Sequence, residues 1–265
     1  MLFSPMKVIT HNLPDSLTEA NILPLGDLHL GDPHSYFPRI REWLDYLALT
    51  DSAYAILNGD LMDAAIASSI GDTYGAALQP MEQLRECVGL FEPIKDKILA
   101  VLPGNHEQRI YKTDGLDLTE IMCSQLGIAD RYSPTSALIF LRLGDRQKGA
   151  GRNQRQYCYT LFCLHGSGGG RKEGGKIQRL VDMAGIVDAD VYIMSHVHQP
   201  AVVKQAYFRV NPGTSSVQKV DRLFVNTAAA LEYGGYGELQ GFKPASTDTP
   251  IIRLDGTRKR MAAIL

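Results

Sequence analysis

Residues 54–63 read YAILNGDLMD, an apolar run of strand length that ends in a polar cluster. Two other runs have the same form, with residues 22–25 before the Gly-Asp pair at 26–27 and residues 98–102 before the Pro-Gly-Asn segment at 103–105. Buried strands of α/β proteins deliver functional loops in this way. The pattern therefore predicts strands whose ends carry polar side chains.

Helical patterns separate these runs. One follows Pro38, with apolar residues at the i, i+3, i+4 and i+7 positions, and a second stripe follows Pro80. The two stripes consist of Ile40, Trp43, Leu44 and Leu47, and of Met81, Leu84, Val88 and Phe91. Strand, helix, strand order in the first half of the chain predicts parallel pairing with right-handed crossovers.

The second half of the chain has a different pattern. Short apolar runs follow one another with fewer helices between them, which predicts a second, more mixed sheet. The strands are expected at 137–143, 157–164, 191–194, 206–210 and 223–225, the helices at 116–126 and 176–183, and an exposed hairpin tip or flexible loop at 144–156. With no internal repeat and no long linker, we expect residues 1–265 to form a single domain.

Composition sets only broad limits on function. The chain has 265 residues, of which 45% are hydrophobic and 21% charged, as in a globular protein with a sizeable core. A formal net charge of -2 predicts no overall basic surface, although a local basic patch would still suit nucleic acid. The four cysteines have no CxxC spacing, which predicts reduced, mostly buried thiols.

No segment suggests export or a membrane. Residues 1–14 lack the long apolar region of a signal peptide, and no transmembrane run appears elsewhere. We therefore expect a cytoplasmic protein that does not contact a membrane. The sequence does not specify its oligomeric state.

Five polar clusters stand at predicted strand ends. Each by itself matches an ordinary turn, helix cap or structural histidine. Together, so many carboxylates and imidazoles would be costly to bury without a cation. Oxygen and nitrogen donors without thiolate suit Mn, Fe, Zn or similar divalent ions, and more than six candidate ligands favour two ions. The clusters are Gly26-Asp27-Leu28-His29, Gly59-Asp60-Leu61-Met62-Asp63, Gly104-Asn105-His106-Glu107, Leu164-His165-Gly166 and Ser195-His196-Val197-His198.

In this order the clusters resemble the motifs of the calcineurin-like metallophosphoesterase family, which read DxH, GDxxD, GNH[DE], a lone His and GHxH. The resemblance implies a four-layer αββα sandwich, in which two facing mixed β-sheets are flanked by α-helices. It implies two divalent ions, for which we expect manganese, with iron, zinc, nickel or magnesium as alternatives. It also implies that one ion is held by Asp27, His29, Asp60 and His198, and the other by Asp60, Asn105, His165 and His196, with Asp60 bridging.

The same resemblance leaves His106 free for the substrate. Two ions can bind one phosphoryl group and lower the pKa of a bridging water, so that a metal-bridging hydroxide attacks phosphorus. We expect His106 to stabilise the leaving oxygen or to donate a proton to it. Asp63 resembles the carboxylate that orients a histidine of the site, the alternative being a helix cap. Glu107 could anchor its loop or be solvated.

Departures from the motifs bear on the substrate. Ser/Thr protein phosphatases of the family continue the second motif with Arg-Gly, whereas Ala64-Ala65 follows Asp63 here, which argues against a phosphoprotein phosphatase. Purple acid phosphatases have a tyrosine ligand where Asp63 stands, which argues against a charge-transfer iron site. Ser195 replaces the usual glycine of the last motif, a change expected to cost little.

A glycine-rich segment at 166–176 follows His165. Such backbone can present N–H donors to an anion, and we expect Arg171, Lys172 and Lys176 to contact the substrate. The alternative is a flexible connector. We expect residues 233–237 to form a mobile, aromatic-bearing loop, whose tyrosines could stack on bases or simply cap the core.

These features predict a phosphodiesterase with a nuclease-like action on DNA or RNA. The alternative is a phosphomonoesterase acting on a nucleotide or another small phosphorylated molecule. A non-catalytic metal-binding scaffold is disfavoured, because every expected ligand and His106 are present.

Overall fold

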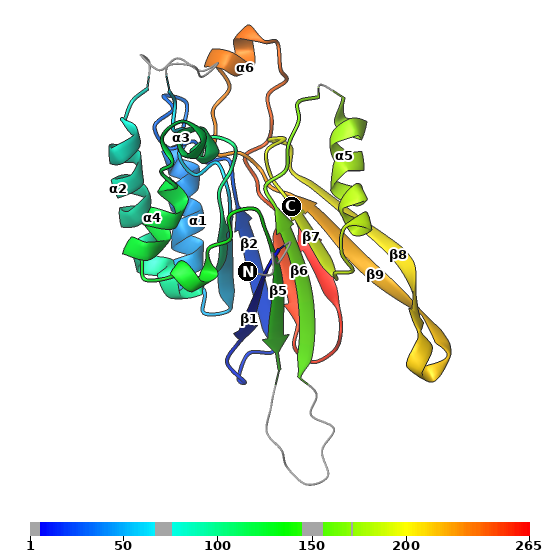
Figure 1. Ribbon diagram of the computed structural model, residues 1–265. Coiled ribbons are helices and arrows are strands. Elements are labelled where there is room, and N and C mark those ends of the chain that lie inside the picture. The colour runs from blue at the N-terminus through cyan, green and yellow to red at the C-terminus, as the bar shows by residue number, and fades with distance from the viewer. Residues whose placement is uncertain (1–5, 67–75, 145–155, 171) are drawn as a thin grey trace.

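The computed structural model describes residues 6–66, 76–144, 156–170 and 172–265, and these form two facing β-sheets with helices on their outer faces (Figure 1). Both sheets are mixed. The first has six strands in the spatial order β1 (Lys7–Asn12), β5 (Ser136–Leu143), β6 (Tyr157–Leu164), β7 (Val191–Met194), β9 (Ser216–Asn226) and β8 (Ala201–Asn211). The second has five, in the order β11 (Met261–Ile264), β10 (Ile251–Asp255), β2 (Glu19–Leu25), β3 (Ala53–Asn58) and β4 (Ile98–Leu102).

The strand pairing agrees with the sequence-based expectation. Strands β2, β3 and β4 are parallel to one another, as the alternation of strands and helices in the first half predicts. The first sheet combines parallel pairs, such as β6 with β7, and antiparallel pairs, such as β5 with β6. The sequence analysis expected a mixed sheet from the second half of the chain. The six-stranded first sheet confirms this expectation.

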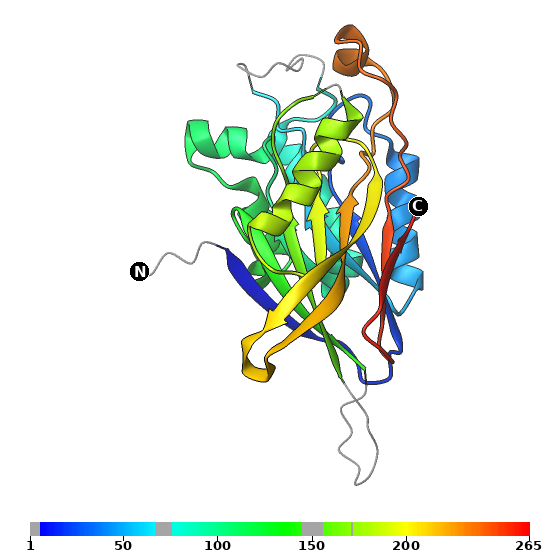
Figure 2. The ribbon, with the colours of Figure 1, turned by 90° about the vertical axis from the view of Figure 1, so that its right-hand side faces the viewer.

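Helices cover the outer face of each sheet (Figures 1 and 2). The second sheet packs against α1 (Phe37–Leu49), α2 (Pro80–Phe91) and α4 (Leu118–Gln125), and α3 (Glu107–Asp114) lies beside them. On the other side, α5 (Glu173–Asp182) covers the first sheet. The expected four-layer sandwich is confirmed. A further short helix, α6 (Gly235–Leu239), lies at the end of the molecule toward which β2 runs.

The inner core lies between the two sheets. All six residues of β3 and all five of β4 are buried, because the inner sheet faces meet each other and the outer faces meet helices. Strands buried on both sides read as continuous apolar runs, which explains why these two were visible in the sequence. The inner core includes Ile56, Ile139, Leu161, Ile193 and Val225.

Some elements differ from the expectation. Strand β1 was not predicted, because it is an edge strand in which only Ile9 is buried and most other residues are polar. On α2, Met81 is exposed, whereas Gln83 and Cys87 are buried. The buried face of α2 is thus rotated relative to the predicted apolar stripe. Gln83 is accommodated in this face because its side chain accepts a hydrogen bond from the amide of Ala64.

The hairpin of β8 and β9 is longer than predicted. Its strands have 11 residues each. The sequence analysis predicted only residues 206–210 of β8, which lie toward the exposed tip, and residues 223–225 of β9, which lie in the buried end of that strand. The segment 145–155, expected as a hairpin tip or loop, lies outside the described residues.

Two smaller expectations concern thiols and membranes. The four cysteines are unpaired, and three of them, Cys87, Cys123 and Cys163, are buried, as predicted. Within the described parts of the chain, none of the helices has the length and apolar character that a membrane crossing requires.

Candidate metal centre

The five polar clusters follow β2, β3, β4, β6 and β7 and converge at one end of the sandwich. The loops after β2 and β3 run side by side, since the amides of Asp27 and His29 donate to the carbonyls of Gly59 and Asp60 at 3.0 Å each. The loops after β6 and β7 are joined by a bond from the amide of Ser195 to the carbonyl of His165 at 2.9 Å. Both sheets thus contribute to one site.

A first group of ligand atoms comes from Asp27, His29 and His198, which offer atoms within 4.8 Å of one another. The Nε2 atoms of His29 and His198 are 3.2 Å apart. The Oδ1 of Asp27 lies 3.5 Å from the Nε2 of His198. The other oxygen of this carboxylate, Oδ2, accepts a hydrogen bond from the amide of His196 at 2.8 Å, which fixes its orientation.

A second group comes from Asp60, His165 and His196, again with ligand atoms within 4.8 Å. The Nε2 of His165 is 3.2 Å from the Oδ2 of Asp60 and 3.2 Å from the Oδ1 of Asn105. The same amide oxygen of Asn105 lies 2.7 Å from the Nδ1 of His196. All seven predicted ligands are therefore brought together in two adjoining groups.

The donor atoms fit divalent cations. The Oδ1 of Asp27 is buried and forms no hydrogen bond among the described residues, although the Nε2 of His198 is 3.5 Å away, and this is costly for a carboxylate oxygen unless a cation is bound. The facing nitrogens of His29 and His198 can have at most one proton between them, as expected for two ligands turned toward a common ion. Carboxylate, amide and imidazole donors suit borderline metals such as Mn, Fe and Zn.

The backbone is strained at the same residues. Seven non-glycine residues in the described ranges have a positive φ, and five of them are predicted ligands. A left-handed backbone costs an L-residue roughly 1–2 kcal/mol, and such strain collects at functional sites. The fold therefore holds these side chains in place at a cost to stability. The five are Asp27, His29, Asp60, His196 and His198, with φ between 46° and 68°.

Two glycines permit the close approach of these loops. A Cβ on Gly104 would lie 2.0 Å from the Oδ1 of Asp60, and a Cβ on Gly59 would lie 2.6 Å from the Nδ1 of His165. Gly59 also has a φ of +87°. No other residue fits at either position, because a side chain would clash with these atoms.

His106 lies beside both groups. Its Nδ1 is 2.9 Å from the carbonyl oxygen of Asp63 and 3.0 Å from the Oδ1 of the same residue. Asp63 also lies 3.8 Å from the Nδ1 of His29. No helix begins at Asp63, so its alternative as a helix cap is wrong, and its carboxylate instead contacts two histidines of the site. A ring nitrogen of His106 also lies within 4.8 Å of ligand atoms of His29 and Asp60. A measurement of bound metal in a variant without His106 would therefore show whether this residue is a ligand.

Arg109 contacts His106 from the first turn of α3. Its Nη2 lies 2.9 Å from the Nε2 of His106. A guanidinium can only donate, so this nitrogen of His106 accepts and its Nδ1 donates to Asp63. The carboxylates of Asp63 and Asp60 raise the pKa of His106 against the effect of its burial. The 2.9 Å contact with Arg109 nevertheless requires an unprotonated Nε2 in this arrangement.

Glu107 anchors the loops. It is fully buried, and its carboxylate accepts hydrogen bonds of 2.6–3.1 Å from four backbone amides. Its alternative as a solvated side chain is therefore wrong. Because one carboxylate binds two loops, it fixes the position of Asp60 relative to the third motif. The four amides belong to Asp60, Leu61, Met62 and Gly104.

Ser195 is part of a buried polar network beneath the site. Its hydroxyl accepts hydrogen bonds from the Nδ2 of Asn58 at 2.7 Å and from the hydroxyl of Thr227 at 2.9 Å. Asn58 also donates to the carbonyl of Leu164 and accepts from the Nδ1 of His165 through its own carbonyl. The serine that replaces a glycine of the motif thus connects the two sheets.

The charges in the site compensate one another. Burial raises the pKa of Asp60, but His165, His106 and His29 outweigh it and hold the pKa well below its ordinary range. Burial lowers the pKa of His165, but Asp60 and Asp27 raise it to about 10. The carboxylates therefore favour positive charge at this position.

The glycine-rich segment borders the same site. The Nζ of Lys176, in the second turn of α5, donates to the carbonyl of Val197 at 3.0 Å, and Val197 stands between His196 and His198. Lys172 is exposed at the beginning of this helix. Arg171, the third predicted contact, lies outside the described residues.

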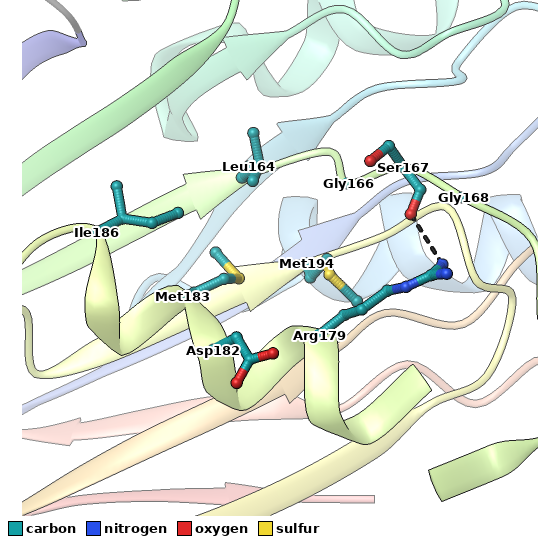
Figure 3. A pocket seen from close by; sticks show the side chains of 9 residues that line it. All are labelled: Leu164, Gly166, Ser167, Gly168, Arg179, Asp182, Met183, Ile186 and Met194. Atoms are coloured by element: carbon teal, nitrogen blue, oxygen red, sulfur yellow. Dashed lines mark hydrogen bonds between the residues drawn. The ribbon is translucent and has the colours of Figure 1, made fainter. Parts of the chain in front are cut away.

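A pocket of about 350 Å³ opens between this segment and α5 (Figure 3). It is lined by the side chains of Leu164, Met183 and Met194, and Arg179, which also lines it, donates to the carbonyl of Ser167 at 3.0 Å. This bond fixes the first part of the glycine-rich segment against α5.

Several contacts of the site were missed in the sequence. Arg109 stands three residues after His106 at a helix start, a spacing that places both on one helix face and could have been recognised. Asn58 directly precedes Gly59, but no local signal shows that its side chain reaches the other sheet. No local signal shows the contact of Gln83 with the amide of Ala64 either, because Gln83 is far from the motifs in the sequence.

The family model for calcineurin-like phosphoesterases matches residues 28–200, more than half of the chain. No curated protein sequence matches significantly. Among solved structures, a conserved predicted phosphoesterase from Streptococcus pneumoniae has 13% identity and a TM-score of 0.36, over 94% of this chain and 99% of that chain. A single mutant of Vps29 from Entamoeba histolytica has 12% identity and a TM-score of 0.41, over 92% of this chain and 99% of the other.

The chain belongs to the calcineurin-like phosphoesterase family. It is a metal-dependent phosphoesterase, a hydrolase whose substrate is a phosphate ester.

Proposed function

We propose that this phosphoesterase hydrolyses the phosphodiester bonds of DNA or RNA. The observation that supports it most is the position of Lys176, whose ammonium group lies 3.0 Å from the carbonyl between two candidate ligands. With Lys172 exposed on the same segment, the border of the site is basic although the net charge of the chain is -2. A local basic border suits a polyanionic substrate.

The two groups of side chains would each hold one divalent cation, with Asp60 shared. We propose manganese, with iron, zinc, nickel or magnesium as alternatives that the same donors accept. When bound, such ions draw charge from a phosphoryl oxygen and make water a nucleophile near neutral pH. One ion would be held by Asp27, His29, Asp60 and His198, and the other by Asp60, Asn105, His165 and His196.

The chain's own contribution to the reaction centres on His106. Asp63 fixes its ring through the contacts at Nδ1, so that Nε2 faces the site, 3.9 Å from the Oδ2 of Asp60. From there the imidazole, once Nε2 has taken up a proton, would stabilise charge on the leaving oxygen or donate that proton to it. The carboxylates of Asp63 and Asp60 favour this protonation, because they raise the pKa of His106 against the effect of its burial. The half-buried environment of the ring, with 17% of its side chain exposed, limits competition from water.

A second candidate function is hydrolysis of a phosphomonoester, such as a nucleotide. The contact between Arg109 and His106 favours it, because a guanidinium is suited to a phosphate dianion. Because Arg109 places a guanidinium beside His106, the absence of an arginine after Asp63 does not argue against a phosphomonoester substrate.

A three-substrate comparison separates the candidates. Metal-loaded protein would be assayed on bis-p-nitrophenyl phosphate, p-nitrophenyl phosphate and single-stranded DNA, with two ions per chain measured by elemental analysis. The proposal expects hydrolysis of the diester and of DNA, and loss of both with Asp60→Ala. Hydrolysis of the monoester alone would support the second candidate, and inactivity on all three with two ions bound would contradict both.

A further inference from the structure

Arg109 provides a guanidinium group beside the metal centre. It lies on α3 three residues after His106, and that spacing places both residues on the same helix face. Its Nη2 is 2.9 Å from the Nε2 of His106, and this imidazole ring packs edge-on against His29 with ring centroids 4.4 Å apart. The guanidinium is therefore one side chain away from the candidate ligands.

The hydrogen bonds at His106 leave one assignment of donors. Nδ1 faces two oxygens of Asp63, which accept, and Nε2 faces Arg109, which can only donate. The N–H of Arg109 is thus directed at the nitrogen of His106 that lies 3.9 Å from the Oδ2 of Asp60, on the side of the candidate ligands. A neutral nitrogen is a weak acceptor for a guanidinium compared with a phosphoryl oxygen, whose bonds to it are charge-assisted.

The loop after β3 cannot supply such a group. Ala64 and Ala65 follow Asp63, and both are buried. Ala64 has a φ of +47°, and its amide donates to the side chain of Gln83 at 2.8 Å, which closes the loop against α2. A long cationic side chain at this position would have to leave the buried arrangement. Arg109 approaches the site from a different motif.

We propose that Arg109 binds a non-bridging oxygen of the substrate's phosphoryl group, with that oxygen replacing the Nε2 of His106 as its acceptor. This rests on the proposed function, since it assigns the phosphoryl subsite of the same centre. The exchange removes the guanidinium from Nε2 of His106, which then no longer serves as its acceptor. Arg109 is thus a substrate-binding residue with two connected effects, anchoring the phosphate and releasing His106.

The test measures phosphate binding rather than turnover alone. Inorganic phosphate is titrated calorimetrically into metal-loaded wild-type protein and into Arg109→Gln, Arg109→Lys and Arg209→Gln. Arg209 is a matched control in the exposed part of β8, where it pairs with Asp188 at 2.9 Å. We expect Arg109→Gln to weaken phosphate binding by about 10-fold to 100-fold, the range for a charged hydrogen-bond partner of 1.5–3 kcal/mol. Arg109→Lys should recover part of the loss, and Arg209→Gln should bind as wild type.

A second variant separates direct contact from action through His106. In a His106→Ala background, Arg109→Gln should still weaken phosphate binding if the guanidinium touches the phosphate. No further loss in that background would make Arg109 a positioning residue only and overturn the proposal, as would wild-type binding by Arg109→Gln alone with two ions bound. If instead wild-type protein holds two ions but binds no phosphate and hydrolyses no ester, the proposed function fails and not the assignment of Arg109 alone. Thermal unfolding of each variant confirms that it is folded.

Discussion

The hydroxyl of Ser195 accepts a hydrogen bond of 2.7 Å from the side chain of Asn58, and these two residues stand at the ends of strands in different sheets. The two sheets are therefore joined by a polar contact directly beneath the metal centre. A Cβ on Gly26 would lie 2.5 Å from this hydroxyl, so the small residue at 26 makes room for it. The replacement of the motif's glycine by serine is thus accommodated by its neighbours.

Ser195→Ala should destabilise the protein. It leaves the hydroxyl of Thr227 and one N–H of Asn58 without their acceptor in a fully buried position, and an unsatisfied buried donor costs about 1–3 kcal/mol. Urea unfolding of metal-free protein would measure the free energy of unfolding without a contribution from bound ions. Ser124→Ala, at an exposed position of α4, is the control and should change it by less than about 0.5 kcal/mol. Equal stability of Ser195→Ala and wild type would show that the network contributes nothing.

Glu107→Ala should have a larger effect, because four backbone amides lose their acceptor at once. We expect a loss of about 3 kcal/mol or more, together with weaker metal retention, since the loop of Asp60 is released. Differential scanning calorimetry and chelator-stripping rates would measure the two effects. Glu86→Ala, exposed on α2, serves as the control. If a chelator removed metal from Glu107→Ala at the wild-type rate, the prediction of weaker metal retention would be wrong, and Glu107 would anchor the loops without affecting metal binding.

The sequence predicted the parts of the fold whose burial is uniform. Strands β3 and β4 are buried on both faces and read as apolar runs with polar ends, so that strand and functional loop were visible together. Strand β1 was missed, because half of an edge strand faces solvent and its residues alternate irregularly. The distal half of β9 was missed for the same reason, because most of its residues from 216 to 222 are exposed.

The candidate ligands were predictable because each motif is local and glycines mark where loops approach. The contacts that support them were not. Asn58, Ser195 and Gln83 act across distances in the sequence that only the packing of sheets and helices specifies. Glu107 was left open between two roles, because nothing in the sequence shows that four amides face its carboxylate.

Lys176→Ala should weaken binding of nucleic acid without changing metal content. Its ammonium group contacts a backbone carbonyl and none of the candidate ligand atoms, so the centre itself is untouched. The KM for single-stranded DNA should rise with kcat nearly constant, as for uniform binding, and the slope of log K against log salt should fall by about 0.7 for one phosphate contact. Lys219→Ala, exposed on β9, is the control. An unchanged KM and salt slope would return the segment to its alternative role as a connector.

His106→Ala tests the division between ligands and catalytic residue. The imidazole lies beside both groups, and its Nδ1 is directed toward Asp63 rather than toward an ion. The variant should therefore retain two ions per chain, while turnover falls by roughly 10²-fold to 10⁴-fold, the scale for a positioned acid or an electrostatic donor.

The leaving group sharpens this test of His106. A nitrophenolate departs without a proton, whereas a sugar alkoxide needs one, so the deficit should be larger on nucleic acid than on bis-p-nitrophenyl phosphate. Asp63→Asn should show a smaller deficit of the same kind, because it loosens the ring of His106 without removing it. Loss of an ion in His106→Ala would instead make the residue a ligand, in line with its grouping with His29 and Asp60. Retention of both ions with full activity on nucleic acid would mean that another group supplies the proton, and Arg109 is too basic to do so.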